Sequence, residues 1–360
     1  MRITIDATSA LLRSAGVKGY TYHWLRSLVQ QAETSDEIRA FPRLNTWARL
    51  DHERSALPFA PTVARLSALH AANVLGSPVL DLLLGRTDIF HAGNLVRQAP
   101  HNARLTATIH DLTSWIMPEV HTSATLRADR TFEERILKRA HGLIAVSENT
   151  RQDAIRLLKI PPDRIRTIHS GVAEQYFDAK PEPRGKAYVL FVGTVEPRKN
   201  LDTLLDAWRS LKAETREQFE LVIAGPQGWN SETTMARIRQ EASYLGYVPE
   251  QEMPGLVAGA SLFVYPSLYE GFGFPLVQAM AANVAVLSSQ TSCLPEIAGD
   301  AAAFVDPRSP SEMAAQLTRL LESRDERSRL AQLGRARAAS YRWERCARES
   351  LEFFRDIAAR

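Results

Sequence analysis

Short apolar runs alternate along the whole chain with stretches in which apolar residues recur at a helical period. The expected strands cover residues 2–6, 89–91, 104–109, 143–146 and 166–168, then 188–192, 221–224, 262–265, 285–288 and 303–305. The expected helices cover residues 20–31, 123–140, 149–158, 200–212, 233–245, 274–282, 310–321 and 340–360. Regular alternation of strand and helix is typical of parallel sheets covered on both faces. The pattern therefore predicts an α/β protein.

The chain is too long for one hydrophobic core. It has 360 residues, whereas single cores stop growing at roughly 250–300 residues. Residues 172–186 contain two prolines, a glycine and several charges, which favours a linker there. We expect an N-terminal domain at 1–171, the linker at 172–186, a C-terminal domain at 187–340 and a final helix at 341–360. That helix could pack on either domain, including a return to the first.

Charge and cysteine content exclude several classes of protein. Residues 1–180 carry 23 Lys and Arg against 18 Asp and Glu (+5), and residues 181–360 carry 21 against 23 (−2), which gives +3 in all. So small a charge does not indicate a nucleic-acid partner. Cys293 and Cys346 lack metal-type spacing, which argues against a zinc site and a disulfide framework. The start lacks a signal-peptide pattern, and no apolar run approaches the roughly 20 residues of a membrane span. We expect a cytoplasmic protein.

The segment at residues 267–279 carries the strongest chemical signal. A buried strand runs into a glycine-rich turn that opens a helix. Gly271 and Gly273 would let the backbone approach a ligand, and Pro275 suits a first helical turn. This is no dinucleotide fingerprint, because the third glycine is missing. The plain alternative is a loop with a helix cap.

Polar groups in this segment suit a sugar and an anion. Free amides near Phe274 and Leu276 would point at an anion at the helix N-terminus. Glu270 stands at the carboxyl end of the strand, where a carboxylate can accept hydrogen bonds from sugar hydroxyls. Gln278, eight positions on and two turns into the helix, is expected on roughly the same face.

A second strand, glycine turn and helix start occurs at residues 190–201. Arg198 and Lys199 are adjacent cations placed where a diphosphate would lie over the second sheet. Two adjacent basic residues before a helix are usually just exposed surface residues. The prediction of a diphosphate site therefore depends on their combination with Glu270.

Weaker signals come from other strand ends. His110 follows an apolar strand of the first domain, and Asp111 could cap the next turn or orient the imidazole. The turn containing Gly16 could approach a phosphate. The loops at 224–229 and 245–253, the latter containing Val248, are consistent with a pocket for a base.

Taken in order, these segments resemble the family-4 glycosyltransferases, a group of retaining enzymes with the GT-B fold. The resemblance is close over residues 186–310, through FVGTVEPRKN, VIAGPQGW, LGYVPEQEMPGL and SLFVYPSLYEGFGFPLVQAM. It is looser at Gly16, at TIHDL (108–112) and at LIAVSENTR (143–151). It implies two Rossmann-like domains facing a cleft, with a nucleotide-sugar donor on the second and the acceptor on the first.

The resemblance also implies roles for single residues. Lys199, with Arg198, matches the cations that bind the donor diphosphate and stabilise the departing nucleotide. Glu270 matches the glutamate that contacts the transferred sugar, and His110 resembles the first-domain histidine that does so. Gln278 replaces the glutamate that usually holds the ribose, so ribose recognition is expected to be weaker. The residues expected to contact the donor are Gly16, Gly193, Thr194, Val248, Gly271, Phe272, Gly273, Phe274, Leu276 and Gln278. Thr194 stands where many members have an arginine, for which Arg198 could substitute.

The mechanism implied is transfer with retention and without a protein nucleophile, a cofactor or a metal. The acceptor hydroxyl attacks from the face of the leaving phosphate, while domain closure excludes water. The form GTVEPRKN resembles mannose-transferring members of surface-polysaccharide synthesis, which makes GDP-mannose the first expectation; UDP-glucose-type donors stay open. A glycan or lipid-linked acceptor would make the protein peripheral to a membrane. The basic helix at 123–140 suits that role, although a solvated helix face is the simpler reading.

Other classes of protein fit the sequence less well. A GT-B sugar-nucleotide epimerase shares the fold, but the Arg198, Lys199 and Glu270 segments favour transfer. A phosphorylase would be longer and would bind pyridoxal phosphate. A non-catalytic protein that binds nucleotide sugars is an alternative, because Gln278 replaces the family's glutamate. A nicotinamide enzyme is disfavoured by the incomplete glycine signature.

Overall fold

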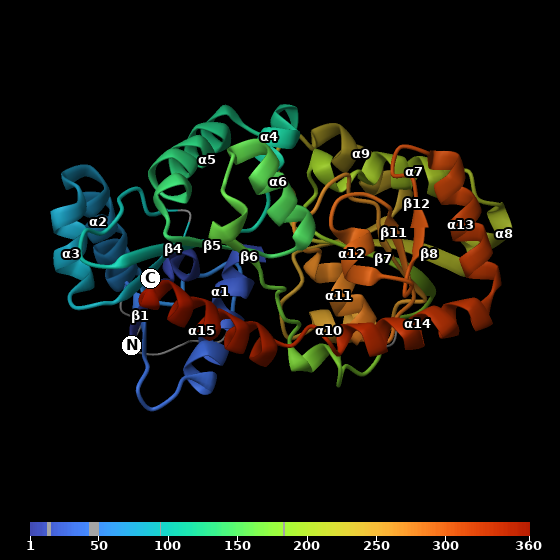
Figure 1. Ribbon diagram of the computed structural model, residues 1–360. Coiled ribbons are helices and arrows are strands. Elements are labelled where there is room, and N and C mark those ends of the chain that lie inside the picture. Colours follow the sequence, from blue (N-terminus) through green and yellow to red (C-terminus); the bar gives the residue numbers. More distant parts are fainter. Residues whose placement is uncertain (13–15, 43–49, 94, 183) are drawn as a thin grey trace. The chain divides into compact units, whose positions relative to one another are not determined.

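The computed structural model describes residues 1–12, 16–42, 50–93, 95–182 and 184–360. These residues form two compact units. Unit 1 comprises Met1–Ile116, Ser123–Gly171 and Trp343–Arg360, and unit 2 comprises Met117–Thr122 and Val172–Arg342. Each unit is built on its own parallel sheet with helices around it (Figure 1). The predicted α/β class with two Rossmann-like sheets is confirmed.

The sheet of unit 1 has six described strands in the order β2-β1-β3-β4-β5-β6, all parallel. Their bounds are β1 Arg2–Asp6, β2 Glu37–Phe41, β3 Ile89–Ala92, β4 Arg104–Ile109, β5 Gly142–Ala145 and β6 Ile165–Thr167. From the neighbouring strands β1 and β3, the chain adds β2 on one side and β4, β5 and β6 on the other. Because all the strands are parallel, the carboxyl ends of β1, β3 and β4 lie along the same edge of the sheet. Ligands of such sheets bind outside this edge.

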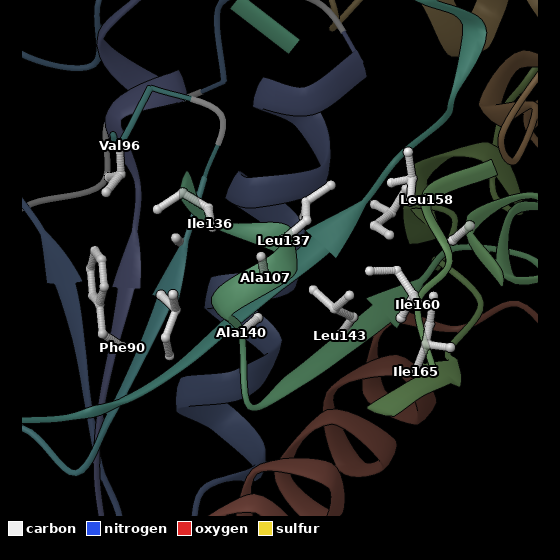
Figure 2. Packing of buried hydrophobic residues seen from close by; sticks show 14 of the residues in the cluster. Phe90, Val96, Ala107, Ile136, Leu137, Ala140, Leu143, Leu158, Ile160 and Ile165 are labelled. Carbon is white, nitrogen blue, oxygen red and sulfur yellow. The ribbon is translucent and has the colours of Figure 1, made fainter. Parts of the chain in front are cut away.

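Helices cover both faces of that sheet. The α-helices are α1 Gly16–Gln31, α2 Phe59–Leu75, α3 Ser77–Leu84, α4 Thr113–Ile116, α5 Ser123–Arg135, α6 Glu148–Leu158 and α15 Trp343–Ala359. Short 3-10 helices are η1 Thr8–Leu11, η3 Leu137–Arg139 and η4 Pro162–Arg164. Under one face of the sheet, Leu143, Ile160 and Ile165 join a core with Phe90 and Ile136 (Figure 2).

The last helix, α15, belongs to unit 1. It packs along α1, where Trp24 Nε1 donates a hydrogen bond of 3.0 Å to the buried Ser350 Oγ. It also covers β5, because a Cβ at Gly142 would lie only 2.5 Å from Ile357 Cδ1. The expected helix at the end of the chain therefore does return to the first sheet (Figure 1).

Unit 2 repeats the architecture, with six described parallel strands in the order β12-β11-β10-β7-β8-β9. The strands are β7 Ala187–Val192, β8 Phe219–Ala224, β9 Ser243–Gly246, β10 Leu262–Tyr265, β11 Val286–Ser289 and β12 Ala303–Val305. The helices are α7 Leu201–Arg209, α8 Ala213–Gln218, α9 Glu232–Glu241, α10 Met253–Ala258, α11 Phe274–Ala281, α12 Leu294–Ala298, α13 Pro310–Glu322 and α14 Arg324–Ala338, with η2 Pro118–Val120, η5 Glu174–Tyr176 and η6 Pro197–Lys199.

Some expected elements are wrong at their edges. The helix expected at 233–245 ends at Glu241, and residues 243–246 form β9, since pairing with β8 outweighs the helical pattern. The glycine turn expected before residue 20 is already helical from Gly16. The helix expected at 123–140 stops at Arg135, after which η3 forms.

No helix among the residues described here combines the length and the apolar character that a membrane crossing requires.

Candidate active site

In unit 2, two loops meet at the carboxyl ends of the neighbouring strands β7 and β10. The loop after β7 contains Arg198, and its carbonyl accepts a hydrogen bond of 2.9 Å from Leu268 N in the loop after β10. The side chain of Asn200 donates to Pro266 O at 3.1 Å, which ties the same two loops again. The segments expected to carry chemistry are therefore adjacent, although they lie some 70 residues apart in the sequence.

Glu270 joins both predicted cations. Its Oε1 is 2.6 Å from Lys199 Nζ, and its Oε2 is 2.8 Å from Arg198 Nη1. Glu270 and Lys199 are buried. Arg198 is held further by the Tyr269 carbonyl at 2.8 Å. The structure thus brings together three of the four residues expected to be catalytic, in a pairing that the sequence did not predict.

Burial and charge shift the ionisation of this cluster in a consistent direction. Burial alone would raise the pKa of Glu270, but the charges of Arg198 and Lys199 overcome it and hold the pKa at about 2. Burial, with the neighbouring Arg198, lowers the pKa of Lys199 below its usual value, against the attraction of Glu270. The carboxylate is therefore ionised at neutral pH and fixed between two cations.

Three further residues complete the cluster and were not identified from the sequence. Glu196 is buried and accepts from Arg198 Nη2 at 2.7 Å. The hydroxyl of Tyr265 accepts from Lys199 Nζ at 3.0 Å, and Ser292 Oγ accepts from Glu270 N at 3.0 Å. Glu196 lies within the same motif as Arg198, so its acidic side chain was a usable signal. Ser292 had no such signal in the sequence, because it lies in the loop after a different strand, β11.

Two glycines let the backbones at this edge approach one another. Gly273 has φ 85°, in the left-handed region, and a Cβ there would lie 2.8 Å from Leu294 Cδ2. At Gly225, with φ 139°, a Cβ would lie 2.0 Å from the Gly193 carbonyl oxygen. The loop holding Gly193 and Thr194 is thus pressed against the loop after β8.

The helix after the glycine turn differs from expectation in two ways. α11 begins at Phe274, which puts Gln278 about one turn into the helix, and not two. The amide of Leu276 is not free, because it donates to Gly273 O at 3.1 Å, as the first turn tightens onto its cap. The Leu276 side chain is buried.

The remaining donor residues of unit 2 are placed as follows. Phe272 is buried, with its ring centroid 5.1 Å from that of Phe274. Gly271 is buried beside it, and Gln278 is partly buried. Val248 follows the edge strand β9, and β8 separates that strand from β7. Val248 therefore does not join the Glu270 cluster.

Unit 1 has its own pocket of about 250 Å³ where β1, β3 and β4 end. His110 lines it, directly after β4, with its ring edge-on to Tyr20 at a centroid distance of 4.7 Å. Burial lowers the pKa of His110 to about 4, partly offset by Asp111. The imidazole is therefore neutral at pH 7. Asp111 caps the next turn, since its Oδ1 accepts from Thr113 N at 3.1 Å.

The pocket also contains two buried titratable residues that the sequence did not single out. Asp6 accepts from Thr8 N at 2.9 Å and from Gly93 N at 3.0 Å, and burial raises its pKa to about 6. His91 lies between Thr106 and Thr108, with ring nitrogens 3.0 Å from each hydroxyl. Asp6 ends the first strand, a position that could have been noticed. Gly16 is exposed at the start of α1.

Over the part of the chain that the structure describes, no group of His, Cys, Asp and Glu side chains is arranged to hold a metal ion.

The buried carboxylate between two cations lies at the carboxyl edge of a parallel sheet, where α/β proteins bind their ligands. Residues 172–337 match the model described as glycosyl transferases group 1, and residues 14–176 match glycosyltransferase family 4. The O-antigen chain mannosyltransferase B of Escherichia coli is 32% identical over 283 residues, which cover 74% of each chain.

Solved structures of low sequence identity share the fold. Sucrose-phosphate synthase from Thermosynechococcus elongatus has a TM-score of 0.74 at 17% identity, covering 100% of this chain and 99% of that one. HepE from Anabaena in complex with UDP-glucose has a TM-score of 0.69 at 16% identity, covering 99% of this chain and 100% of that one. The chain belongs to glycosyltransferase family 4. It is a glycosyltransferase with the GT-B fold.

Proposed function

We propose that the protein transfers a hexose, with mannose the first candidate, from a nucleotide-diphosphate sugar to a hydroxyl of a glycan or lipid-linked acceptor, with retention and without a catalytic metal or other cofactor. The observation that carries the proposal is the buried cluster in which Glu270 fixes Lys199 and Arg198 at the carboxyl end of a parallel sheet. Cationic N–H donors held in place at this edge suit a diphosphate.

The two cations would stabilise the leaving nucleotide. Two N–H donors of the Lys199 ammonium point to Tyr265 and Glu270, which leaves a third for a phosphate oxygen. A diphosphate that gains charge as it departs interacts more strongly with Lys199 and Arg198 in the transition state than in the ground state. This difference is what lowers a barrier.

Retention follows if the acceptor attacks from the face that the phosphate leaves. The bond from the anomeric carbon to the phosphate oxygen breaks, and a bond to the acceptor oxygen forms. The acceptor proton passes to the departing phosphate oxygen, so no protein nucleophile is required. A neutral His110 can accept or donate one hydrogen bond to a sugar hydroxyl, as the low pKa of its ring allows.

The similar proteins named above support the choice of donor and acceptor. The Escherichia coli protein that is 32% identical is an O-antigen chain mannosyltransferase, which favours GDP-mannose and a growing surface glycan. UDP-glucose is the second candidate, because HepE, which shares the fold, was solved with it. A lipid-linked acceptor would bring the enzyme to the cytoplasmic face of a membrane as a peripheral protein.

Calorimetric titration in the presence of a chelator tests the donor site. GDP-mannose, GDP, UDP-glucose and UDP are each titrated into the wild type and into two variants, Lys199→Ala and Lys199→Met. Methionine keeps most of the length of the lysine side chain without its charge. Lys212→Ala is the control, because Lys212 is exposed. We expect saturable binding of one nucleotide family, lost in both Lys199 variants and kept in Lys212→Ala. Binding that needs an added divalent ion, or that survives both Lys199 substitutions, would contradict the proposal.

A further inference from the structure

One buried carboxylate of the cluster in unit 2, that of Glu196, has no part in the mechanism proposed above. Glu196 is 5% exposed and stands immediately before η6. Its carbonyl accepts from Lys199 N at 3.0 Å, but within this described segment its side chain forms no capping hydrogen bond with the helix. A glutamate that only started a turn would leave its carboxylate in water, because burying a charge is costly. The buried carboxylate therefore has another role.

The backbone on either side of Glu196 is fixed to the loop after β8. Val195 N donates to Pro226 O, and Val195 O accepts from Gly228 N, both at 2.9 Å. A Cβ at Gly228 would lie only 3.5 Å from Glu196 Cβ, so the two loops are in contact at this point. The position of Glu196 is therefore set by the sheet and does not depend on a mobile loop.

The side chain of Glu196 binds the same cation that Glu270 binds. Arg198 Nη2 donates to Glu196 Oε1 at 2.7 Å, and Arg198 Nη1 donates to Glu270 Oε2 at 2.8 Å. The guanidinium thus lies between two carboxylates, and the arginine side chain is only 14% exposed. Because both ends of the planar guanidinium are held by charged acceptors, its orientation is fixed.

The formal charges of these four side chains cancel. Arg198 and Lys199 are the two cations, and Glu196 and Glu270 are the two anions. The influence of Glu196 also reaches Lys199: burial and Arg198 lower the pKa of that lysine, and attraction by Glu270 and Glu196 partly offsets this. Without Glu196, the other three side chains would sum to one positive charge in a buried place. A diphosphate, which is multiply charged, would then be attracted more strongly.

We infer that Glu196 is a positioning residue that holds Arg198 in place and, by its own charge, limits how tightly the site holds a diphosphate. Binding that is equally strong before and during transfer does not speed the chemical step. The departing nucleotide keeps its diphosphate, so a site with an excess of positive charge would also release this product slowly. The inference rests on the proposed function in that it takes the cluster as the diphosphate site.

Calorimetric titration of the full chain tests this with probes that differ in the number of phosphates. The probes are inorganic pyrophosphate and, for both guanosine and uridine, the nucleoside, its monophosphate and its diphosphate. Glu196→Gln keeps the shape of the side chain and removes its charge, whereas Glu196→Asp keeps the charge. Glu214→Gln is the matched control, because Glu214 is exposed on α8, which leads into the opposite end of β8.

We expect Glu196→Gln to bind pyrophosphate, and the nucleoside diphosphate that the wild type binds, about tenfold more tightly than the wild type does. The gain should be smaller for the monophosphate and absent for the nucleoside. Glu196→Asp and Glu214→Gln should bind all probes as the wild type does. The double variant Glu196→Gln/Arg198→Gln removes one charge of each sign, so the tighter binding should disappear.

Three results would overturn the inference. One is unchanged or weaker diphosphate binding by Glu196→Gln, and another is an equal gain for the nucleoside, which would show that charge is not the cause. The third is a Glu196→Gln variant that does not fold, because the carboxylate would then serve the fold. Thermal unfolding of each variant identifies this last case.

Pyrophosphate separates this inference from the proposed function, because it contains neither a base nor a sugar. If Glu196→Gln tightens pyrophosphate binding but no sugar nucleotide binds, the proposed function fails and the inference stands. If sugar nucleotides bind through Lys199 but Glu196→Gln has no effect, the inference alone fails. Absence of binding for every diphosphate, in the wild type and in Glu196→Gln, would overturn both.

Discussion

Glu270 is the residue on which the chemistry of unit 2 converges. Its carboxylate is buried, ionised and shared between Lys199 and Arg198, and its own amide is bound by Ser292. Burying charged groups costs desolvation free energy, so a buried ion pair adds little to the stability of the fold. The main effect of this arrangement is to hold the two cations in place. Preorganisation of this kind is what a site for a developing negative charge requires.

Residue identity at position 278 should tune nucleotide affinity. Gln278 stands where the family resemblance places a ribose-binding glutamate, and an ionised carboxylate accepts stronger hydrogen bonds than an amide oxygen does. We expect Gln278→Glu to tighten nucleotide binding about tenfold, which corresponds to about 1.4 kcal/mol. Calorimetry measures it, with Gln316→Glu on α13 as the control. Equal or weaker binding by Gln278→Glu would show that the ribose is held elsewhere.

At Gly225 a single methyl group should be intolerable. A Cβ would lie 2.0 Å from the Gly193 carbonyl oxygen, so the loops after β7 and β8 would have to separate. We expect Gly225→Ala to lower the free energy of unfolding of unit 2 by about 3 kcal/mol or more and to weaken donor binding. Thermal and urea unfolding measure the first effect. Gly185→Ala is the control, because a Cβ there meets nothing within 4 Å; similar losses in both variants would contradict the clash.

The residues of the site were predictable only where the sequence marks a strand end. Arg198, Lys199, Glu270 and His110 each follow an apolar run, and each lies at a sheet edge in the structure. That Glu270 would pair with both cations was not predictable, because the pairing depends on β7 and β10 being neighbours in a sheet. Asp6 was missed although it ends the first strand, and His91 was missed because a single histidine inside an apolar strand carries no motif.

At the scale of elements, the central strands were predictable, and so were the edge strands β6 and β12, but the edge strands β2 and β9 were not. β7 and β10 are apolar throughout because helices cover both faces of the sheet. β2, with the sequence EIRAF, and β9, with SYLG, pair on one side only and keep polar residues. Their pairing comes from the neighbouring strand, which no local pattern reports.

The contact of α15 with α1 should depend on one buried hydrogen bond. Ser350→Ala leaves Trp24 Nε1 without its acceptor in a buried place, which costs about 1–3 kcal/mol of unfolding free energy. Chemical unfolding followed by the fluorescence of the tryptophans measures this. The exposed Glu352→Ala on the same helix should change little. If Trp24→Phe cost as much in the Ser350→Ala background as in the wild type, the hydrogen bond would not be the cause.

For the whole molecule, acid should unfold unit 1 before unit 2. Burial lowers the pKa of His91 to about 3 and of His110 to about 4, from an ordinary 6.5, so their stabilising contribution is full above pH 6.5 and declines as the pH falls toward 4. The raised pKa of Asp6 acts oppositely below pH 6, but it is one group against two. In unit 2, Glu270 loses its contribution only as the pH falls from 4.5 toward about 2.

Hydrogen exchange followed by mass spectrometry, corrected for the intrinsic rate at each pH, can follow both units in one sample. We expect peptides of β3 and β4 to lose protection at a higher pH than peptides of β7 and β10. A His91→Gln variant should move the onset for unit 1 to lower pH and leave unit 2 unchanged. Earlier loss in unit 2 would mean that other groups dominate the acid response.

The return of α15 to unit 1 has a consequence for synthesis on the ribosome. The chain emerges from its N-terminus, so all of Val172–Arg342 is made before the helix that covers α1 and β5 exists. Unit 2 has its sheet complete by then and can fold while translation continues. Unit 1 must wait, with Trp24 and the surface over Gly142 uncovered, until the final helix leaves the exit tunnel. Unit 1 is therefore translated first but completes its fold last. A chaperone that acts on nascent chains would bind the uncovered surface of unit 1.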